Sequence, residues 1–553
     1  MFRNRLNRAI AYKMIFDQHS ISEDRMAAGY ERLERHGFIA IWRGFLFVRG
    51  EIAGRDSVNV LLSSFRRLGP QATLALAKGS FLLAILDCRS REVFVCVDPF
   101  GLARLFAADA VLSDDLFELI IRLGYDEGQL DLAALAFFLR FGFYGMGRTI
   151  DRRVRFLAGD DIAYLSSSND LRRLRKSLPD FDHAPETFDF DAYLRDVRTA
   201  IQSQQISLDL TGGYDSRLLA ACLKDLIAET ATTGQPGNLD VAIAARVAAV
   251  LKLPHIKTRH DIAGFAERAP TLLRLTHAQT GLLAYDHVYQ LTRERQLRGT
   301  TLVIAGIGGE LWKDILWLQD FPFLSGSPDF QRLYRTRLEP RAPAEAQFDA
   351  LFVSEFAAAG QSYLSAMQER FGALPRTAAY DSVYAFLRIP YTAGPSVTAG
   401  IRMGLPTFSP LYDLDGALAS MHKPPRERLF ARWHRRNIVR NAPEITKLRC
   451  DDGLSALSGL ASMADIPSYL GNKVLRAAQK IAQRFGLPDI RHLSLDDPET
   501  LATARESPLT FPALDRMRQL HVLAHDADAA QCERALFDRL LTSGMTLNEF
   551  ETR

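Results

Sequence analysis

The stretch that most constrains this chain runs from Ile206 to Leu223 and reads ISLDLTGGYDSRLLAACL. Its first part, Ser207–Leu210, is a short apolar-rich run typical of a buried parallel strand. Two glycines follow Thr211, and the apolar residues after Arg217 predict a helix. A strand, a glycine turn and a helix start together aim backbone N–H groups and the positive end of a helix dipole at an anion. The stretch therefore predicts a parallel α/β sheet with a phosphate-binding loop.

The side chains of this loop suit a bound nucleotide. The hydroxyls of Thr211 and Ser216 can contact phosphate, and Asp215 can hold a Mg²⁺ ion that bridges phosphate groups. The Gly-Lys-Ser/Thr ending of a kinase or GTPase P-loop is absent. The alternative is a tight strand-to-helix turn that binds no ligand. Under the first interpretation, six residues contact the nucleotide or its metal ion: Thr211, Gly212, Gly213, Tyr214, Asp215 and Ser216.

Composition narrows the class of protein. At 553 residues the chain is long enough for two or more domains, and its 47% apolar and 24% charged residues are ordinary for a globular protein. A formal net charge of +3 provides no general attraction to nucleic acid. The five cysteines form no CxxC pair, and the sequence has neither a signal-peptide pattern nor an apolar run of membrane-spanning length. We therefore expect a cytoplasmic protein with no membrane or nucleic-acid partner.

Strand and helix patterns divide the chain into two parts. Between residues 37 and 165, short apolar runs bounded by polar or glycine residues predict strands, with helices at 58–68 and 132–140. Residues 166–186 are polar and basic and contain two prolines, which is typical of a linker. Strands then alternate with helices, and residues beyond 330 are mostly helical by periodicity. We predict an N-terminal domain at 1–170, a linker at 171–190 and a C-terminal domain at 191–553.

Three later segments carry residues that a nucleotide-dependent ligase needs. Gly234 ends a predicted strand, and Asp240 starts the next helix, either beside the nucleotide or as an ordinary helix-start carboxylate. Residues 304–310 again predict a strand, a glycine turn and an acid, so Glu310 is a second candidate Mg²⁺ ligand, with the same helix-start alternative. Lys447 lies in an irregular segment and could stabilise the negative charge that develops during adenylate transfer, although a lone lysine usually just faces solvent.

The C-terminal motifs, in this order, resemble the asparagine synthetase family. Thr211–Ser216 resembles its pyrophosphate loop, with Thr in place of Ser at the first position. Gly306–Glu310 is similar to its Gly-x-Gly-x-Asp loop, with Glu in place of Asp. Lys447, five residues before Asp452-Gly453, has the spacing of the family's catalytic lysine. The resemblance implies ATP and Mg²⁺ as cofactors, and it assigns catalysis to Lys447 and Asp215, metal binding to Asp215 and Glu310, and further nucleotide contacts to Gly234, Asp240, Gly306 and Gly308.

The N-terminal part resembles the same family's class II glutamine amidotransferase domain. The segments that carry the resemblance are Val48–Ile52, Gly79–Phe81, Val97–Gly101 and Phe138–Gly142. The resemblance thus covers nearly the whole chain and implies an N-terminal αββα sandwich of the Ntn-hydrolase type. It implies a C-terminal parallel α/β domain of the ATP-pyrophosphatase type, similar to adenine nucleotide α-hydrolases, with extra helices.

The amidotransferase resemblance breaks at the residues that matter for glutamine. Phe2 stands where the family has its nucleophilic cysteine, and the first cysteine of the chain is Cys88. Arg49 replaces an asparagine that would stabilise the oxyanion, and Lys78 replaces the aspartate that would hold the α-amino group of glutamine. We therefore expect no glutaminase activity and a degenerate domain that is structural or docks a peptide.

The synthetase part departs at Ile307, where related enzymes place a Glu or a Tyr near the attacking amine, so another group must accept that proton. Arg217 and Arg449 are possible phosphate partners, although surface positions are commoner, and His287 is more simply a hydrogen-bonded helix residue. The resemblance favours a lasso-peptide cyclase, which closes a macrolactam between a peptide's N-terminal amine and an Asp or Glu side chain. It then implies a precursor peptide, a leader-binding protein and a leader peptidase as partners. A small-molecule or β-lactam-type amide synthetase is the alternative, and a non-catalytic scaffold is a third.

Overall fold

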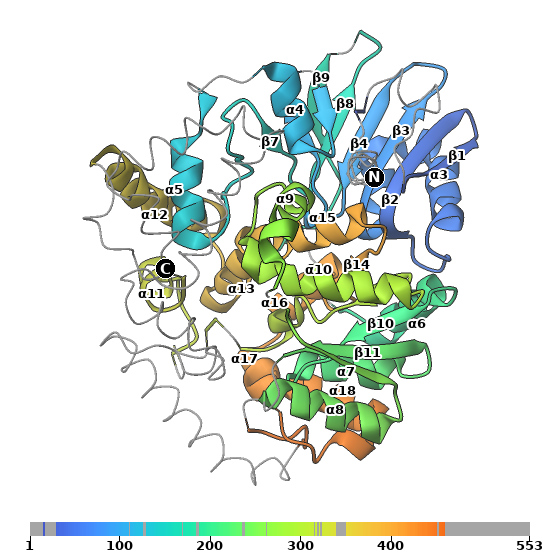
Figure 1. The fold of residues 1–553 in the computed structure, drawn as a ribbon, viewed down its shortest axis with the longest axis vertical. Coiled ribbons are helices and arrows are strands. Elements are labelled where there is room, and N and C mark those ends of the chain that lie inside the picture. The colour runs from blue at the N-terminus through green and yellow to red at the C-terminus, as the bar shows by residue number, and fades with distance from the viewer. Residues whose placement is uncertain are drawn as a thin grey trace.

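A computed structural model describes residues 15–16 and 29–458, apart from gaps at 110, 125–128, 169, 184–186, 235–237, 262, 315, 318–319, 321–322, 339–349 and 451–452. Asp452 and the predicted helices beyond residue 458 lie outside the described residues. Helices and strands of the described part are coloured along the chain in Figure 1.

The N-terminal part is built on a six-stranded sheet in the order β1-β2-β3-β4-β8-β9, in which neighbouring strands are antiparallel. Its central strands are buried on both faces, because alternate residues of β2 enter two different cores. One core is closed by helix α3 (Arg55–Ala75), and the other is shared with the C-terminal part. The strands are β1 (Glu31–Arg35), β2 (Phe38–Phe47), β3 (Lys78–Asp87), β4 (Val93–Val97), β8 (Asp161–Leu165) and β9 (Leu171–Arg175).

Two features of this sheet differ from the expected pattern. The apolar runs at 38–42 and 45–48 form one continuous strand, β2, which passes through Gly44 at a φ of +95°. A Cβ atom at Gly44 would lie 2.4 Å from the backbone oxygen of Ser80, so glycine is what lets two strands pair at this position. Strand β9 occupies the start of the stretch expected as a linker, and its arginines contact Asp160 and Asp161.

A smaller, three-stranded antiparallel sheet, in the order β6-β5-β7, completes the N-terminal part. Two helices pack with it around a second apolar core, and each begins at an aspartate, Asp115 or Asp131, whose side chain accepts from backbone N–H groups of the first turn. The αββα family assignment stays a prediction. The elements are β5 (Phe106–Ala108), β6 (Val111–Ser113), β7 (Arg155–Phe156), α4 (Leu116–Leu123) and α5 (Leu132–Phe141).

The C-terminal part contains the predicted parallel sheet, with five strands in the order β12-β11-β10-β13-β14. The chain first moves from β10 to β11 and β12 on one side, and then crosses to β13 and β14 on the other. The direction of winding therefore changes between β10 and β13. The strands are β10 (Ile206–Asp209), β11 (Ile227–Thr233), β12 (His255–Thr258), β13 (Leu302–Ile304) and β14 (Thr407–Phe408).

Helices cover this sheet and extend beyond it. Helix α18 packs on α7, and α8 packs on β11 and β12. Near the sheet lie α6 (Phe190–Ile201), α7 (Tyr214–Leu223), α8 (Leu239–Leu251), α9 (Phe265–Thr276), α10 (Leu282–Leu297), α15 (Gly394–Arg402), α16 (Leu414–His422) and α18 (Arg432–Asn441). The remaining helical segments are η3 (Gly309–Trp312), α11 (Phe330–Leu333), η5 (Tyr334–Leu338), α12 (Ala350–Phe371), α13 (Arg376–Leu387), α14 (Ile389–Thr392), α17 (Pro425–Arg428), η7 (Leu429–Ala431) and η8 (Pro443–Ile445).

The two parts are packed against each other through apolar and cationic contacts. The rings of Phe45 and Phe47 of β2 pack against the ring of Phe408 of β14 in tilted and edge-on arrangements, with centroids 4.8 and 5.6 Å away. Arg43, which is only 3% exposed, donates to the backbone oxygens of Ile401 and Arg402 at the end of α15. Figure 1 shows the antiparallel sheet, in blue and cyan, above the parallel sheet, with α10 and α15 between them. Across the described residues, none of the helices combines the length and the apolar character that a membrane span requires.

Candidate functional site

The candidate site lies where the winding of the parallel sheet changes direction. Strands β10 and β13 are neighbours and parallel, so the loops that follow them leave the sheet at the same edge. Ligands of open α/β sheets bind in the crevice at such a switch point, outside the carboxyl ends of the strands. The loop after β10 is 210–213, which leads into α7, and the loop after β13 is 305–308, which leads into η3. Both loops were predicted from the sequence.

Hydrogen bonds within the first loop fix its shape. The backbone N–H of Thr211 donates to Oγ of Ser216 at 3.0 Å, and the two hydroxyls are also 3.0 Å apart. The N–H of Gly212 donates to Oδ1 of Asp240 at 3.0 Å. Gly213 is the N-cap of α7 and makes no side-chain cap bond, so the helix N-terminus has no capping side chain. Asp240 lies in the first turn of α8, as one of its two interpretations expected, and it also accepts a bond from the loop; its contact with a nucleotide stays a prediction.

Glycines bring the second loop into contact with the first. A Cβ atom at Gly306 would lie 3.1 Å from Cβ of Asp215, and one at Gly309 would lie 2.4 Å from its Cγ. Gly308 has a φ of +78°, and its added Cβ would lie 2.5 Å from the ring of Tyr412. Side chains at Gly306 and Gly309 would push the loops apart, whereas one at Gly308 would clash with Tyr412. Sequence spacing alone predicts two glycine loops, and the structure shows that Gly306 and Gly309 allow the second loop to contact Asp215.

Four charged or titratable side chains meet where the loops touch. Lys313 Nζ donates to Oδ2 of Asp215 at 2.6 Å, and Nε2 of His434 lies 2.8 Å from Oδ1. Burial raises the pKa of Asp215, but Lys313 and His434 outweigh it and hold that pKa well below its usual value. Burial and the charge of Asp215 raise the pKa of Glu310 to about 7, against a lowering effect of Lys313. Burial lowers the pKa of His434, which is fully buried.

Sequence reasoning missed two of these four residues. Lys313 is three positions after Glu310, and one signal could have indicated it: a cation directly after the short helix that contains Glu310. His434 comes from α18, far along the chain, and no local pattern connects it with Asp215. Its position follows from the packing of α18 on α7, which only the tertiary structure reveals.

The segment around Lys447 is fastened to the loop helix by buried residues of α7. Arg217 is fully buried and donates to the backbone oxygens of Leu448 and Arg449 at 2.6 and 3.0 Å. The hydroxyl of Tyr214 donates to the backbone oxygen of Ser455 at 3.0 Å. Lys447 itself is exposed. Arg217 is therefore a buried anchor, where we expected a surface residue or a phosphate partner, and Tyr214 anchors the same segment.

For Gly234 and His287, the structure shows packing contacts with neighbouring residues. A Cβ atom at Gly234 would lie 2.6 Å from Cγ2 of Val241, so this glycine permits close packing of the end of β11 against α8. His287 is half-buried on α10, as expected for a helix residue, and burial lowers its pKa. Its ring centroid lies 5.9 Å from that of His260.

The acid pair suits a divalent cation. Oδ1 of Asp215 is buried and has no hydrogen-bond partner, because the nearby Nε2 of His434 is not aligned to donate to it. Glu310 supplies a second carboxylate close enough for its pKa to respond to Asp215. Mg²⁺ is typically bound by one or two protein carboxylates when phosphate groups of the substrate supply further ligands. Across the described residues, no cluster of three or more His, Cys, Asp or Glu side chains forms an all-protein metal site.

The two residues that replace glutamine-binding groups are engaged between the two parts of the chain. Lys78 Nζ donates to Oδ2 of Asp413 at 2.7 Å and to Oδ2 of Asp415 at 3.0 Å. Arg49 donates to the same Asp415 oxygen at 2.9 Å. Burial lowers the pKa of Lys78, but the two carboxylates raise it above its usual value. These cations pair with the start of helix α16, so they are interface residues in this structure.

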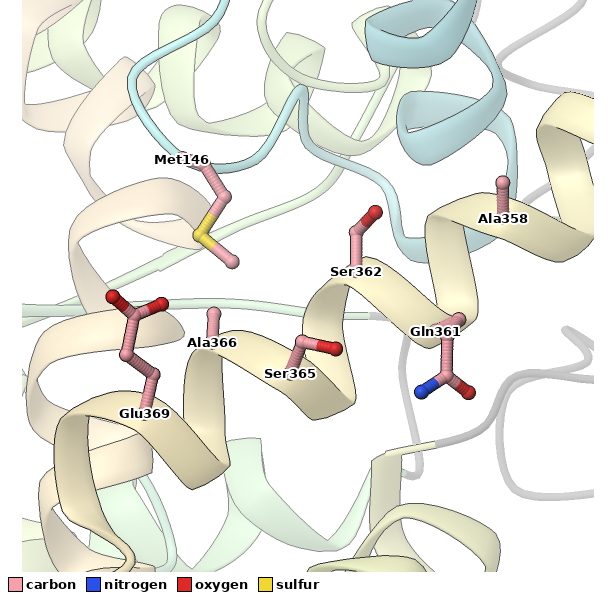
Figure 2. A pocket seen from close by; sticks show the side chains of 7 residues that line it. All are labelled: Met146, Ala358, Gln361, Ser362, Ser365, Ala366 and Glu369. Carbon is pink, nitrogen blue, oxygen red and sulfur yellow. The ribbon is translucent and has the colours of Figure 1, made fainter.

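An open groove of about 580 Å³ lies elsewhere, along helix α12. Figure 2 shows Met146, on a loop of the N-terminal part, pointing toward the face of α12 that carries Ala366 and Glu369. None of the predicted site residues lines this groove. The chemistry of the switch point makes that site, and not the groove, the candidate active site.

Comparison with known proteins agrees with the geometry at a coarse level. Over 295 residues the chain is 24% identical to proteins named "Putative asparagine synthetase (glutamine-hydrolyzing)" from Mycobacterium bovis and Mycobacterium tuberculosis. The alignment covers 48% of this chain and 45% of each relative, so the chain spans about half the length of the relatives it matches. No family model matches the chain. The similarity supports the asparagine synthetase family.

Proposed function

We propose that this protein forms amide bonds by activating a carboxylate with ATP. One observation carries the proposal: a phosphate-type loop and an acidic glycine loop meet at the switch point of a parallel sheet, with Asp215 and Glu310 at their contact. The similarity to asparagine synthetases supports ATP-dependent amide formation as the general class of reaction. Neither observation identifies the substrate.

The proposed reaction has two steps. A carboxylate oxygen of the substrate attacks the α-phosphorus of ATP, the bond to the β-phosphate bridging oxygen breaks, and pyrophosphate leaves. An amine then attacks the acyl carbon of the adenylate, AMP leaves, and the amine proton passes to the released phosphate or to solvent. The side chain of Ile307 has no group that could accept this proton. The products are an amide, AMP and pyrophosphate, and all atoms of the reactants are retained in them.

Residues of the chain have distinct parts in this scheme. The N–H groups at the start of α7 and the hydroxyls of Thr211 and Ser216 would bind the departing pyrophosphate. Asp215 and Glu310 would hold Mg²⁺. The bound ion would neutralise negative charge on the phosphate oxygens. Lys447, on the segment anchored by Arg217, would stabilise the charge that develops on the α-phosphate.

For the substrate, we propose a ribosomal precursor peptide that is closed into a macrolactam. Ammonia from glutamine is an unsuitable amine here, because Arg49 and Lys78 are engaged with Asp413 and Asp415 instead of glutamine. That leaves an amine on the substrate or on a second substrate. A small-molecule amide synthetase is the alternative. The groove along α12 does not decide between them, because it lies away from the switch point.

Comparative mass spectrometry of producing cells tests this proposal, with the intact gene against Asp215→Ala. A peptide that appears only with the intact gene, is one water lighter than its encoded segment and resists linearisation supports macrolactam formation. A small amide metabolite that depends on Asp215 supports the alternative. Identical metabolite profiles from the two strains, with both proteins folded and expressed, would contradict an amide-forming function.

A further inference from the structure

We propose that the Lys313 ammonium group is a built-in counter-charge for the carboxylates of Asp215 and Glu310. It keeps the binding of a metal ion alone weak and favours the binding of the metal ion together with a polyphosphate. The inference rests on the proposed function, because it concerns the same site. It assigns to Lys313 a role that the sequence motifs do not contain.

Lys313 occupies one side of the Asp215 carboxylate. Its Nζ lies 2.6 Å from Oδ2, whereas Oδ1 faces His434 and has no hydrogen-bond partner. The side chains of Lys313 and Asp215 are only 18% and 15% exposed, so water screens this pair weakly. A divalent cation that bridges Asp215 and Glu310 would therefore meet an ammonium group already in place at Oδ2.

The summed charge of Asp215, Glu310 and Lys313 explains how the Lys313 ammonium group affects ligand binding. Asp215 and Glu310 bring two carboxylates together in a desolvated place, and Lys313 acts on both of them. In the absence of ligands, Lys313 offsets one of the two negative charges and so weakens the attraction of the carboxylates for a metal ion. Once a metal ion joins Lys313, the cluster is net positive, which suits the several negative charges of a polyphosphate. Lys313 therefore opposes the metal alone and favours the metal together with the anion.

This role predicts two effects of opposite sign. Lys313→Gln keeps an N–H donor for Oδ2 of Asp215 but removes the charge. We expect it to tighten the binding of Mn²⁺ alone by about tenfold, because a cation no longer opposes the metal. We expect it to weaken the binding of inorganic pyrophosphate in saturating Mn²⁺ by about tenfold, because the anion loses a counter-charge. A residue that merely stabilised the fold would weaken both.

The experiment measures Mn²⁺ by the loss of its free electron paramagnetic resonance signal, and pyrophosphate by calorimetry, on the full chain. Lys313→Arg keeps the charge and should bind both ligands like the wild type. Lys224→Met removes a cation from the exposed pair with Glu444 and should change neither affinity. Lys313→Met provides a second neutral variant if the Gln variant does not fold, and the same two shifts are expected of it.

Two outcomes separate this inference from the proposed function. If the neutral variants bind Mn²⁺ no more tightly than the wild type, or bind pyrophosphate equally well, the role of Lys313 is wrong, while Asp215 remains a metal ligand. If the Asp215→Asn variant binds Mn²⁺ as tightly as the wild type, Asp215 is not a metal ligand, and the proposed function loses its cofactor site.

Discussion

At the scale of single residues, Asp215 is the most constrained side chain of the candidate site. Lys313 contacts one of its oxygens, His434 lies against the other, and Gly306 and Gly309 pack on its carbon atoms. The motif predicted an acid at this position, but not these neighbours. All four come from beyond residue 305, so the immediate surroundings of Asp215 are a product of tertiary structure.

Gly309→Ala tests whether the two loops must touch. The new Cβ would lie 2.4 Å from Cγ of Asp215, so the loops must separate. We expect the affinity for MgATP, measured by calorimetry, to fall by about tenfold or more, because misplaced charged groups each contribute on this scale. Gly299→Ala is the control: its φ of +83° makes an alanine strained by about 1–2 kcal/mol, but no atom lies within 4 Å of the added carbon. Wild-type affinity in Gly309→Ala would show that the contact is dispensable.

At the scale of elements, helix α7 joins the phosphate loop to the segment that carries Lys447. Its Arg217 is fully buried and satisfies two backbone oxygens, while its Tyr214 hydroxyl satisfies a third. A buried arginine is costly unless its donors are paired. The helix therefore holds the Lys447 segment firmly beside the loop.

Arg217→Met tests this anchoring. The substitution leaves two part-buried backbone oxygens without their charged donor and puts an uncharged side chain in a fully buried position, so we expect the free energy of unfolding to fall by about 2–4 kcal/mol in denaturant titration. We also expect the rate of adenylate formation to fall further than ATP affinity, because Lys447 loses its position and the loop does not. Arg293→Met, at an exposed position of α10, should cost no more than about 0.5 kcal/mol. Equal stability of the two variants would contradict the anchoring role.

Helices and strands could be predicted from the sequence where capping residues and apolar residues mark their bounds. The helix expected to start at Asp240 is α8 in the structure, because Asn238 caps its start and the apolar residues after it are good helix formers. Strand β12 was not predicted, since His255–Thr258 is short and half polar. Strand β9 was missed for a related reason: its sequence, LRRLR, looks like a charged linker. Edge strands carry such charges because they face solvent and must not pair with other chains.

At the scale of the whole molecule, the two parts of the chain form one packed unit around shared apolar and charged contacts. Sequence reasoning identified Arg49 and Lys78 as departures from a glutamine site, and it could go no further. The structure shows what these residues do instead: they pair with Asp413 and Asp415 at the start of α16. These partners are more than three hundred residues apart in the sequence. The packing of the two parts of the chain decides which carboxylates each cation contacts, and no local sequence pattern indicates it.

The central claim is that the switch-point site activates a carboxylate by adenylation. The most direct measurement follows ¹⁸O from a labelled substrate carboxylate, with the substrate taken from the comparison of intact and Asp215→Ala strains, during one turnover with ATP. Adenylation of the carboxylate predicts AMP that contains one ¹⁸O atom, together with unlabelled pyrophosphate. Release of ADP with ¹⁸O in inorganic phosphate would mean attack at the γ-phosphate, and would contradict the proposed adenylation.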